Sequence, residues 1–206
     1  MKNFLIIPAL MLAFSNFSVT NAAALRLEIE GGVSKQVGQF YDNFNWGFDL
    51  GGDIFFYLDN NLLLGIRVAY NRWTPNDSDL IKDFTGLVNG NVSGHAFSWE
   101  FIPTLRLTTD VPTSLVNLFL QGGAGLYVIN DKTTITGTTT GGVPLDKTFG
   151  SGSRGRFGVQ MGGGFAFGNP EFISIDVFSL YNIVFMGGES STFKYFVINL
   201  GLGIGI

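Results

Sequence analysis

The sequence predicts an all-β fold, an eight-stranded antiparallel up-and-down β-barrel that crosses a membrane. Three observations predict it. Large apolar residues alternate with small or polar residues in eight runs, long and short connections alternate between the runs, and the chain carries few charges. Charged residues make up 14% of the 206 residues, against about 25% in an ordinary soluble domain.

The composition excludes several other classes of protein. A helical membrane span is not expected after the N-terminal region, because no later run of about 18 apolar residues lacks a charge or strong polar group. An aromatic content of 15% opposes disorder. The net charge of −4 argues against nucleic-acid binding, which requires a basic surface. The absence of cysteine removes disulfides and thiolate metal sites.

Residues 1–24 have the layout of a secretory signal peptide. Lys2 supplies a short positive region, residues 4–17 are apolar, and Ala22, Ala23 and Ala24 supply a small-residue cleavage site. Cleavage after Ala24 leaves a single exported domain over residues 25–206.

The dominant period of the mature chain is two residues, which is the period of a β-strand. Leu62, Leu64 and Ile66, for example, alternate with Gly65 and Arg67. The eight runs that we interpret as strands span residues 25–33, 44–58, 62–70, 97–107, 116–128, 157–167, 173–185 and 196–206.

The connections between these runs alternate in length. Short turns are expected at 59–61, 109–113 and 168–170, while residues 74–93 and 130–153 form long polar segments that we interpret as loops. Loops of about 20 residues are unusual in compact soluble domains but are normal on the outer side of outer-membrane barrels. An even number of strands then places both termini in the periplasm.

The apolar face is expected to point outward to lipid. An eight-stranded interior is only just wide enough to be filled by side chains, so the many large apolar residues would overpack it, whereas the small residues of the other face suit a narrow lumen. A soluble barrel with an apolar core is the alternative. Two aromatic girdles are expected: Phe44, Trp46, Tyr70, Trp73, Phe97, Trp99 and Phe157 near the loops, and Phe56, Tyr57, Phe165, Phe167 and Phe172 near the turns.

The signal peptide, the eight strands and the asymmetry of the loops resemble the small outer-membrane β-barrel family, of the OmpA transmembrane domain and OmpX type. The resemblance covers essentially the whole mature chain. Residues 199–206 resemble the C-terminal signal read by the barrel-assembly machinery, although the chain ends in Ile206 where the usual residue is Phe. The resemblance implies a monomer in the outer membrane of a Gram-negative envelope, in contact with outer-membrane lipid and lipopolysaccharide.

Charges that face the lumen need partners, because a buried charge must be paired and hydrogen-bonded. If Leu58 faces Leu62 across the short turn, Asp53 lies opposite Arg67, and Glu100 falls near the same height. We therefore predict an Asp53–Arg67–Glu100 cluster, which serves either as packing of a filled lumen or as a gate in a narrow ion path. The other charges predicted in the lumen are Arg26, Glu28, Glu30, Asp49, Arg106, Arg156 and Asp176.

Catalysis is not expected. His95 is the only histidine, which opposes a zinc site, and we expect no metal and no cofactor. Outer-membrane lipid A deacylases use histidine, serine and glutamate, and His95, Ser98 and Glu100 are close in sequence. Alternation nevertheless puts His95 on the lipid face and the other two residues in the lumen, so the base could not reach its nucleophile.

The leading hypothesis is a non-enzymatic outer-membrane barrel with a structural or surface-binding role. The surface role would use extracellular loops 2 and 3, residues 74–93 and 130–153, toward an extracellular ligand that the sequence does not identify, because function on a rigid scaffold usually lies in its loops. The alternatives are a porin-like narrow channel for ions or a small solute and, less favoured, a lipid A-modifying enzyme.

Overall fold

The computed structural model describes residues 25–38, 44–76, 87–109, 115–150, 152–169, 172–187 and 192–206. The predicted signal peptide and its cleavage site at Ala24 lie outside the described residues. Within the described ranges, no helix is long and apolar enough to cross a membrane.

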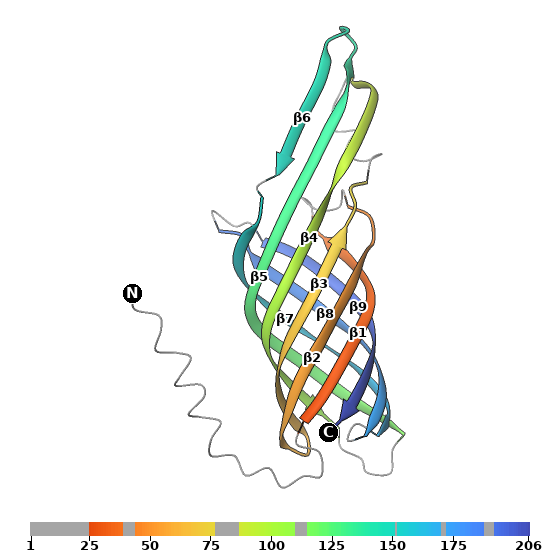
Figure 1. Cartoon of the computed structure of the whole chain (residues 1–206), viewed down its shortest axis with the longest axis vertical. Coiled ribbons are helices and arrows are strands. Elements are labelled where there is room, and N and C mark those ends of the chain that lie inside the picture. The colour runs from red at the N-terminus through yellow and green to blue at the C-terminus, as the bar shows by residue number, and fades with distance from the viewer. Residues whose placement is uncertain are drawn as a thin grey trace, which may run out of the picture.

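Nine antiparallel β-strands follow one another along the described part of the chain. They are β1 (Leu25–Val37), β2 (Gly47–Asp59), β3 (Leu62–Trp73), β4 (Leu87–Thr108), β5 (Val116–Thr139), β6 (Pro144–Gly150), β7 (Arg154–Asn169), β8 (Ile173–Phe185) and β9 (Thr192–Gly205). They form one sheet in the order β4-β3-β2-β1-β9-β8-β7-β5-β6. A further β4–β5 pairing closes all of these strands except β6 into a ring (Figure 1). The predicted eight-stranded up-and-down barrel is therefore confirmed.

The ring closes where the first strand meets the last. β1 pairs with β9 from Arg26 opposite Gly205 to Val37 opposite Lys194. The Leu25 amide donates to the Ile206 carbonyl at 3.2 Å, and the Ile206 amide donates to the Leu25 carbonyl at 2.8 Å. Closure leaves no open sheet edge within the ring.

Alternation decides which face each side chain occupies, because successive residues of a strand point to opposite sides. In β8, Ile175 and Val177 face outward while Asp176 and Phe178 are buried inside. The outward side chains are mostly apolar and well exposed, up to 69% for Ile29. Such a large exposed apolar surface is typical of a membrane-facing protein rather than a soluble one.

The prediction of the aromatic girdles was wrong for Phe44, Tyr57 and Trp73, which are buried inside. Trp73 packs edge-on against Phe193 and Tyr195, with ring centroids 5.6 and 5.1 Å apart. Trp73 is an odd-numbered residue of β3, and the even-numbered residues of this strand face outward, so its side chain points inward. Of the other predicted girdle residues, Trp46, Phe56, Trp99, Phe157, Phe165, Phe167 and Phe172 are exposed, and Tyr70 and Phe97 are half-buried.

The β2–β3 turn also differs from its prediction. Leu62 pairs with Asp59 and not with Leu58, because the register shifts at a bulge beside the turn. The bulge lies between the turn and Asp53, and Asp53 pairs with Arg67 as predicted. A bulge of this kind inserts one unpaired residue, here between the turn and Tyr57, and from Tyr57 opposite Leu63 onward the pairing follows the predicted register.

The two long polar segments were wrongly interpreted as loops, since most of their described residues are strand. β4 and β5 are 22 and 24 residues long, against 12 to 16 for the other ring strands. Residues 87–95, residues 132–139 and β6 form a three-stranded sheet that stands above the ring, which we call the blade (Figure 1). Residues 77–86 and 151 lie outside the described part.

The threonine content of the blade explains why it forms strands although its sequence shows no regular alternation of apolar and polar residues. Threonine has a high preference for strands because its branched side chain fits a pleated surface. Glycines mark its base: Gly94 and Gly150 have φ angles of +149° and +130° and lie on either side of β5. A Cβ atom on either one would approach a backbone oxygen of β5 to 2.1 Å, so only glycine fits there.

Candidate functional site

The interior of the ring holds two groups of buried charged side chains. The first, the Arg106 cluster, consists of Arg26, Glu28, Arg106 and Asp176. Arg106 donates to both carboxylate oxygens of Glu28, at 2.7 and 3.2 Å, and to Asp176 at 3.1 Å. Arg26 donates to Asp176 at 2.9 Å and to the Ser174 hydroxyl at 2.7 Å. Two guanidinium groups face two carboxylates, so the cluster is balanced in charge.

Aromatic rings and an amide complete the surroundings of Arg106. Its Nε atom donates to Gln121 at 2.9 Å. The guanidinium carbon lies 4.4 Å from the centre of the Phe55 ring and 4.2 Å from that of the Phe119 ring. Stacking of this type lets a weakly hydrated cation stay buried.

The second group, the Arg67 cluster, consists of Arg67, Glu30, Asp49, Asp53 and Glu100. Arg67 lies 3.3 Å from Asp53, 3.3 Å from Asp49 and 3.8 Å from Glu100, and it also pairs with Glu30. All five residues are buried, with an exposed fraction of 6% at Glu30 and at most 2% at the others. One guanidinium faces four carboxylates, which is an excess of three negative charges when all are ionised.

Neutral donors provide the remaining contacts of the Arg67 cluster. Asn71 donates to Glu100 at 2.6 Å, and the Tyr195 hydroxyl donates to the same carboxylate. The Asn199 amide donates to Asp49. Within the described chain, Oδ2 of Asp49 and Oε2 of Glu100 accept no hydrogen bond. The four carboxylates are therefore less completely satisfied than those of the Arg106 cluster.

The structure brings the predicted trio Asp53, Arg67 and Glu100 together around one guanidinium. Sequence reasoning placed Glu30 and Asp49 in the lumen but did not assign them to Arg67. Glu30 belongs to β1, which does not neighbour β3, so its contact with Arg67 depends on the width and stagger of the barrel.

The other predicted lumen charges also point inward. Arg26, Glu28, Arg106 and Asp176 are buried in the Arg106 cluster. Arg156 is half-buried near the loop end of β7, where it pairs across the sheet with Tyr127.

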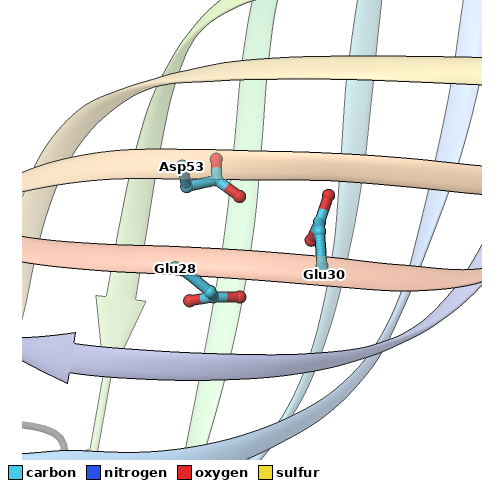
Figure 2. Close-up of side chains that lie close together, drawn as sticks. All are labelled: Glu28, Glu30 and Asp53. Carbon is cyan, nitrogen blue, oxygen red and sulfur yellow. The ribbon is translucent and has the colours of Figure 1, made fainter.

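Three carboxylates join the two clusters. Figure 2 shows Glu28 and Glu30 on β1 and Asp53 on the neighbouring β2, all directed into the barrel; each offers one oxygen within 4.8 Å of the others. Each also pairs with a guanidinium, Glu28 with Arg106 and the other two with Arg67. Arginine therefore supplies the positive charge at this point, and we interpret the trio as part of a continuous ion-pair network.

Large side chains fill the interior on both sides of the charges. Trp73, Phe193 and Tyr195 pack together toward the loop end. Toward the turn end, a cavity of about 20 Å³ lies between Tyr57 and Arg106, which is room for about one water molecule. The described interior is thus a packed core rather than an open pore.

The blade has two different faces. Val92 and Ile135 are buried on one of them, at 6% and 1% exposure. Polar rows cross the other face, and the Thr134 and Thr148 hydroxyls of one row lie 3.1 Å apart. The two rows are Ser93, Thr134 and Thr148, then Asn91, Thr136 and Asp146. Among the described strands, β6 and residues 87–95 pair only with β5, so within the described part of the chain both edges of the blade present unpaired backbone.

Solved structures provide the comparison with known proteins. No protein-family model and no curated protein sequence matches the chain. A major outer membrane protein from Thermus thermophilus superposes with a TM-score of 0.55 at 14% identity, over 89% of this chain and 100% of that one. Neisserial surface protein A gives 0.50 at 13% identity, over 89% and 98%. The outer membrane enzyme PagL gives 0.46 at 15% identity, over 87% and 99%.

The chain has the fold of the small eight-stranded outer-membrane β-barrels. In an outer-membrane barrel, aromatic rings gather on the outer face near the interface. Here Tyr70 lies 4.8 Å from Trp99 and 5.9 Å from Phe48, and Trp46 lies 5.5 Å from Phe196 on the other side of β2. These contacts form an aromatic belt toward the loop end of the barrel.

The histidine of the described chain lies on the outer face of the sheet. His95 stacks on Phe97 with ring centroids 5.9 Å apart. Ser98 and Glu100 are buried on the inner face. The strand separates the histidine from the serine and the glutamate, so the structure does not bring these three residues together.

Proposed function

We propose that this chain is a non-catalytic outer-membrane protein that presents the blade to the outside of the cell as a binding surface for a second protein. In this orientation both termini face the periplasm. The observation that carries the proposal is that β4 and β5 continue beyond the ring and acquire a third strand, β6 (Figure 1).

An exposed strand edge is a binding device. Its unpaired N–H and C=O groups can accept an additional strand from another chain. Among the described residues, the blade has two such edges on a sheet that is anchored by the closed ring. Its threonine-rich face supplies hydroxyl groups for further hydrogen bonds.

The packed interior supports an anchoring role rather than transport. The ion-pair network crosses the barrel, and aromatic side chains close it toward the loop end. A path for ions or a small solute would require the charged side chains to move apart. The proposal includes insertion by the barrel-assembly machinery through residues 199–206, whose apolar side chains alternate outward.

A cell-surface assay tests the proposed function. The full chain and a variant in which residues 132–150 are replaced by Asn-Gly are displayed on cells, and adhesion to immobilised fibronectin, laminin and collagen is measured. The control variant, Thr134→Ser with Thr148→Ser, keeps the hydroxyls and the strand edge. We expect adhesion for the full chain and the control, and loss with the shortened variant. Equal adhesion of the shortened variant, or none for the full chain, overturns the proposal.

Two further measurements test the alternatives. Refolded protein in a planar bilayer is expected to give no steady conductance, and a steady current would favour the narrow channel. Mass spectra of lipid A from cells with and without the protein are expected to be identical. A mass change that requires the chain would favour the enzyme.

A further inference from the structure

The outer and inner faces of the ring differ in the sign of their charges. The inner face carries all the carboxylates of the two ionic clusters. On the outer face, the described charged residues in the loop-end half of the ring strands and the adjoining base of the blade are basic: Lys35, Arg72, Lys132 and Lys194. A basic outer face next to an aromatic belt lies where a membrane protein meets the headgroups of its lipids.

Arg72, His95 and Lys132 form the most concentrated part of this basic surface. Arg72 ends the outward row of β3 and pairs laterally with Phe48 on one side and Phe97 on the other. His95 stacks on Phe97, and Lys132 is the cross-strand neighbour of His95. We call these three residues the basic patch; Arg72 and Lys132 are exposed.

A hydrophobic surface lies directly below the basic patch. Tyr70 is two residues from Arg72 on the same strand, and its ring lies 4.8 Å from Trp99 and 5.9 Å from Phe97. Within the described part of the chain, Arg72 and Lys132 form no ion pair. Neither charge is matched by a carboxylate of the described residues, which suits a ligand whose polar end is anionic and whose other end is apolar.

We propose that the basic patch binds a phosphate group of a lipid A headgroup in the outer leaflet, with an acyl chain lying over Tyr70 and Trp99. Arg72 and Lys132 donate to the phosphate oxygens, the guanidinium through two N–H groups. His95 provides a further N–H beside them. This inference rests on the proposed function, because it requires the loop end of the barrel to lie in the outer leaflet.

Charge complementarity selects this occupant over other lipids. A phosphate monoester carries more negative charge than the phosphodiester of a phospholipid, and two cations on the strands that flank β4 favour it accordingly. Lipid A also supplies several acyl chains, which suit the wide aromatic surface formed by β2, β3 and β4. A free anion lacks the apolar part and gains nothing from that surface.

Native mass spectrometry of the full chain in detergent micelles tests the inference. The probes are bisphosphorylated lipid A, the same lipid without its phosphates, phosphatidylglycerol and inorganic phosphate. We expect binding of bisphosphorylated lipid A to be about tenfold tighter than that of the dephosphorylated form, since each charge-assisted hydrogen bond contributes to affinity. Arg72→Gln combined with Lys132→Gln should remove this preference.

A matched variant shows whether the effect is local. Arg154→Gln combined with Lys194→Gln removes the same charge from the loop end but leaves the basic patch intact, and it should retain the preference. Heat-modifiable gel migration establishes that each variant is folded. Equal loss in both variants, equal binding of phosphatidylglycerol, or binding of inorganic phosphate alone overturns the inference.

The failure of this inference is distinguishable from the failure of the proposed function. Protease treatment of intact cells, followed by detection of cleavage in the blade, reports on orientation alone. A blade that is protected in intact cells and cleaved in lysed cells contradicts the proposed orientation, whatever the lipid preference in micelles.

Discussion

The Arg67 and Arg106 clusters occupy the same barrel and use the same residue types, but they differ in charge balance. Around Arg106, two guanidinium groups meet two carboxylates, and a serine, a glutamine and two aromatic rings complete the contacts. Around Arg67, one guanidinium meets four carboxylates. Buried charge in this barrel is therefore held in two ways: the charges of the Arg106 cluster balance one another, whereas the Arg67 cluster depends on a single cation.

The largest expected effect comes from Arg67→Met, because it leaves four buried carboxylates without a cation. Loss of one partner from a buried ionic group costs about 3–5 kcal/mol, and this variant should lie at the upper end or fail to fold. Urea unfolding in phospholipid vesicles measures the free energy. Arg72→Met on the same strand faces outward and should change stability by less than about 1 kcal/mol.

The second effect, Arg106→Met, should be smaller, at about 3 kcal/mol. Arg26 remains beside Asp176 and Glu28 and compensates part of the loss. The same unfolding experiment makes the comparison directly. A larger loss for Arg106→Met than for Arg67→Met would show that charge balance does not govern the interior.

Neutralising one carboxylate in each cluster should give effects of opposite sign. Glu28→Gln weakens the two-point contact with Arg106 and should lower the free energy of unfolding by about 2 kcal/mol. Glu100→Gln removes one excess negative charge and keeps an oxygen for Asn71 and Tyr195, so it should raise the free energy by about 1 kcal/mol. Destabilisation by both substitutions would contradict the difference between the clusters.

The smallest effect is expected for Ser174→Ala in the Arg106 cluster. The hydroxyl accepts from Arg26 at 2.7 Å and donates to Asp176 at 2.6 Å, and its loss should cost about 1 kcal/mol. Ser179→Ala on the same strand, whose hydroxyl donates only to a backbone carbonyl in the described contacts, is the control. Equal urea midpoints for the two variants would remove the assigned role of Ser174.

The alternating pattern was sufficient to predict the ring, the outward apolar face and the Asp53–Arg67 pair, because these depend on neighbouring strands. Contacts across the lumen, such as Glu28 with Arg106, depend on barrel diameter and strand stagger, which a period of two does not specify. The blade was missed because polar residues occupy both of its faces, so its strands show no apolar alternation. Trp73 lies inside because its odd position on β3 decides its direction, whatever the size of its ring.

The seam between β1 and β9 has a consequence for biogenesis. The first strand, β1, must pair with the last strand, β9, before the sheet can close. Any segment that lacks β9 therefore has two unpaired edges and an exposed apolar face. In water, an incomplete sheet of this kind aggregates, because its unpaired edges and apolar side chains associate with other chains. The ring is complete only when β9 pairs with both β8 and β1. Closure of the ring therefore follows synthesis of the whole barrel from β1 to β9, rather than proceeding strand by strand during translation.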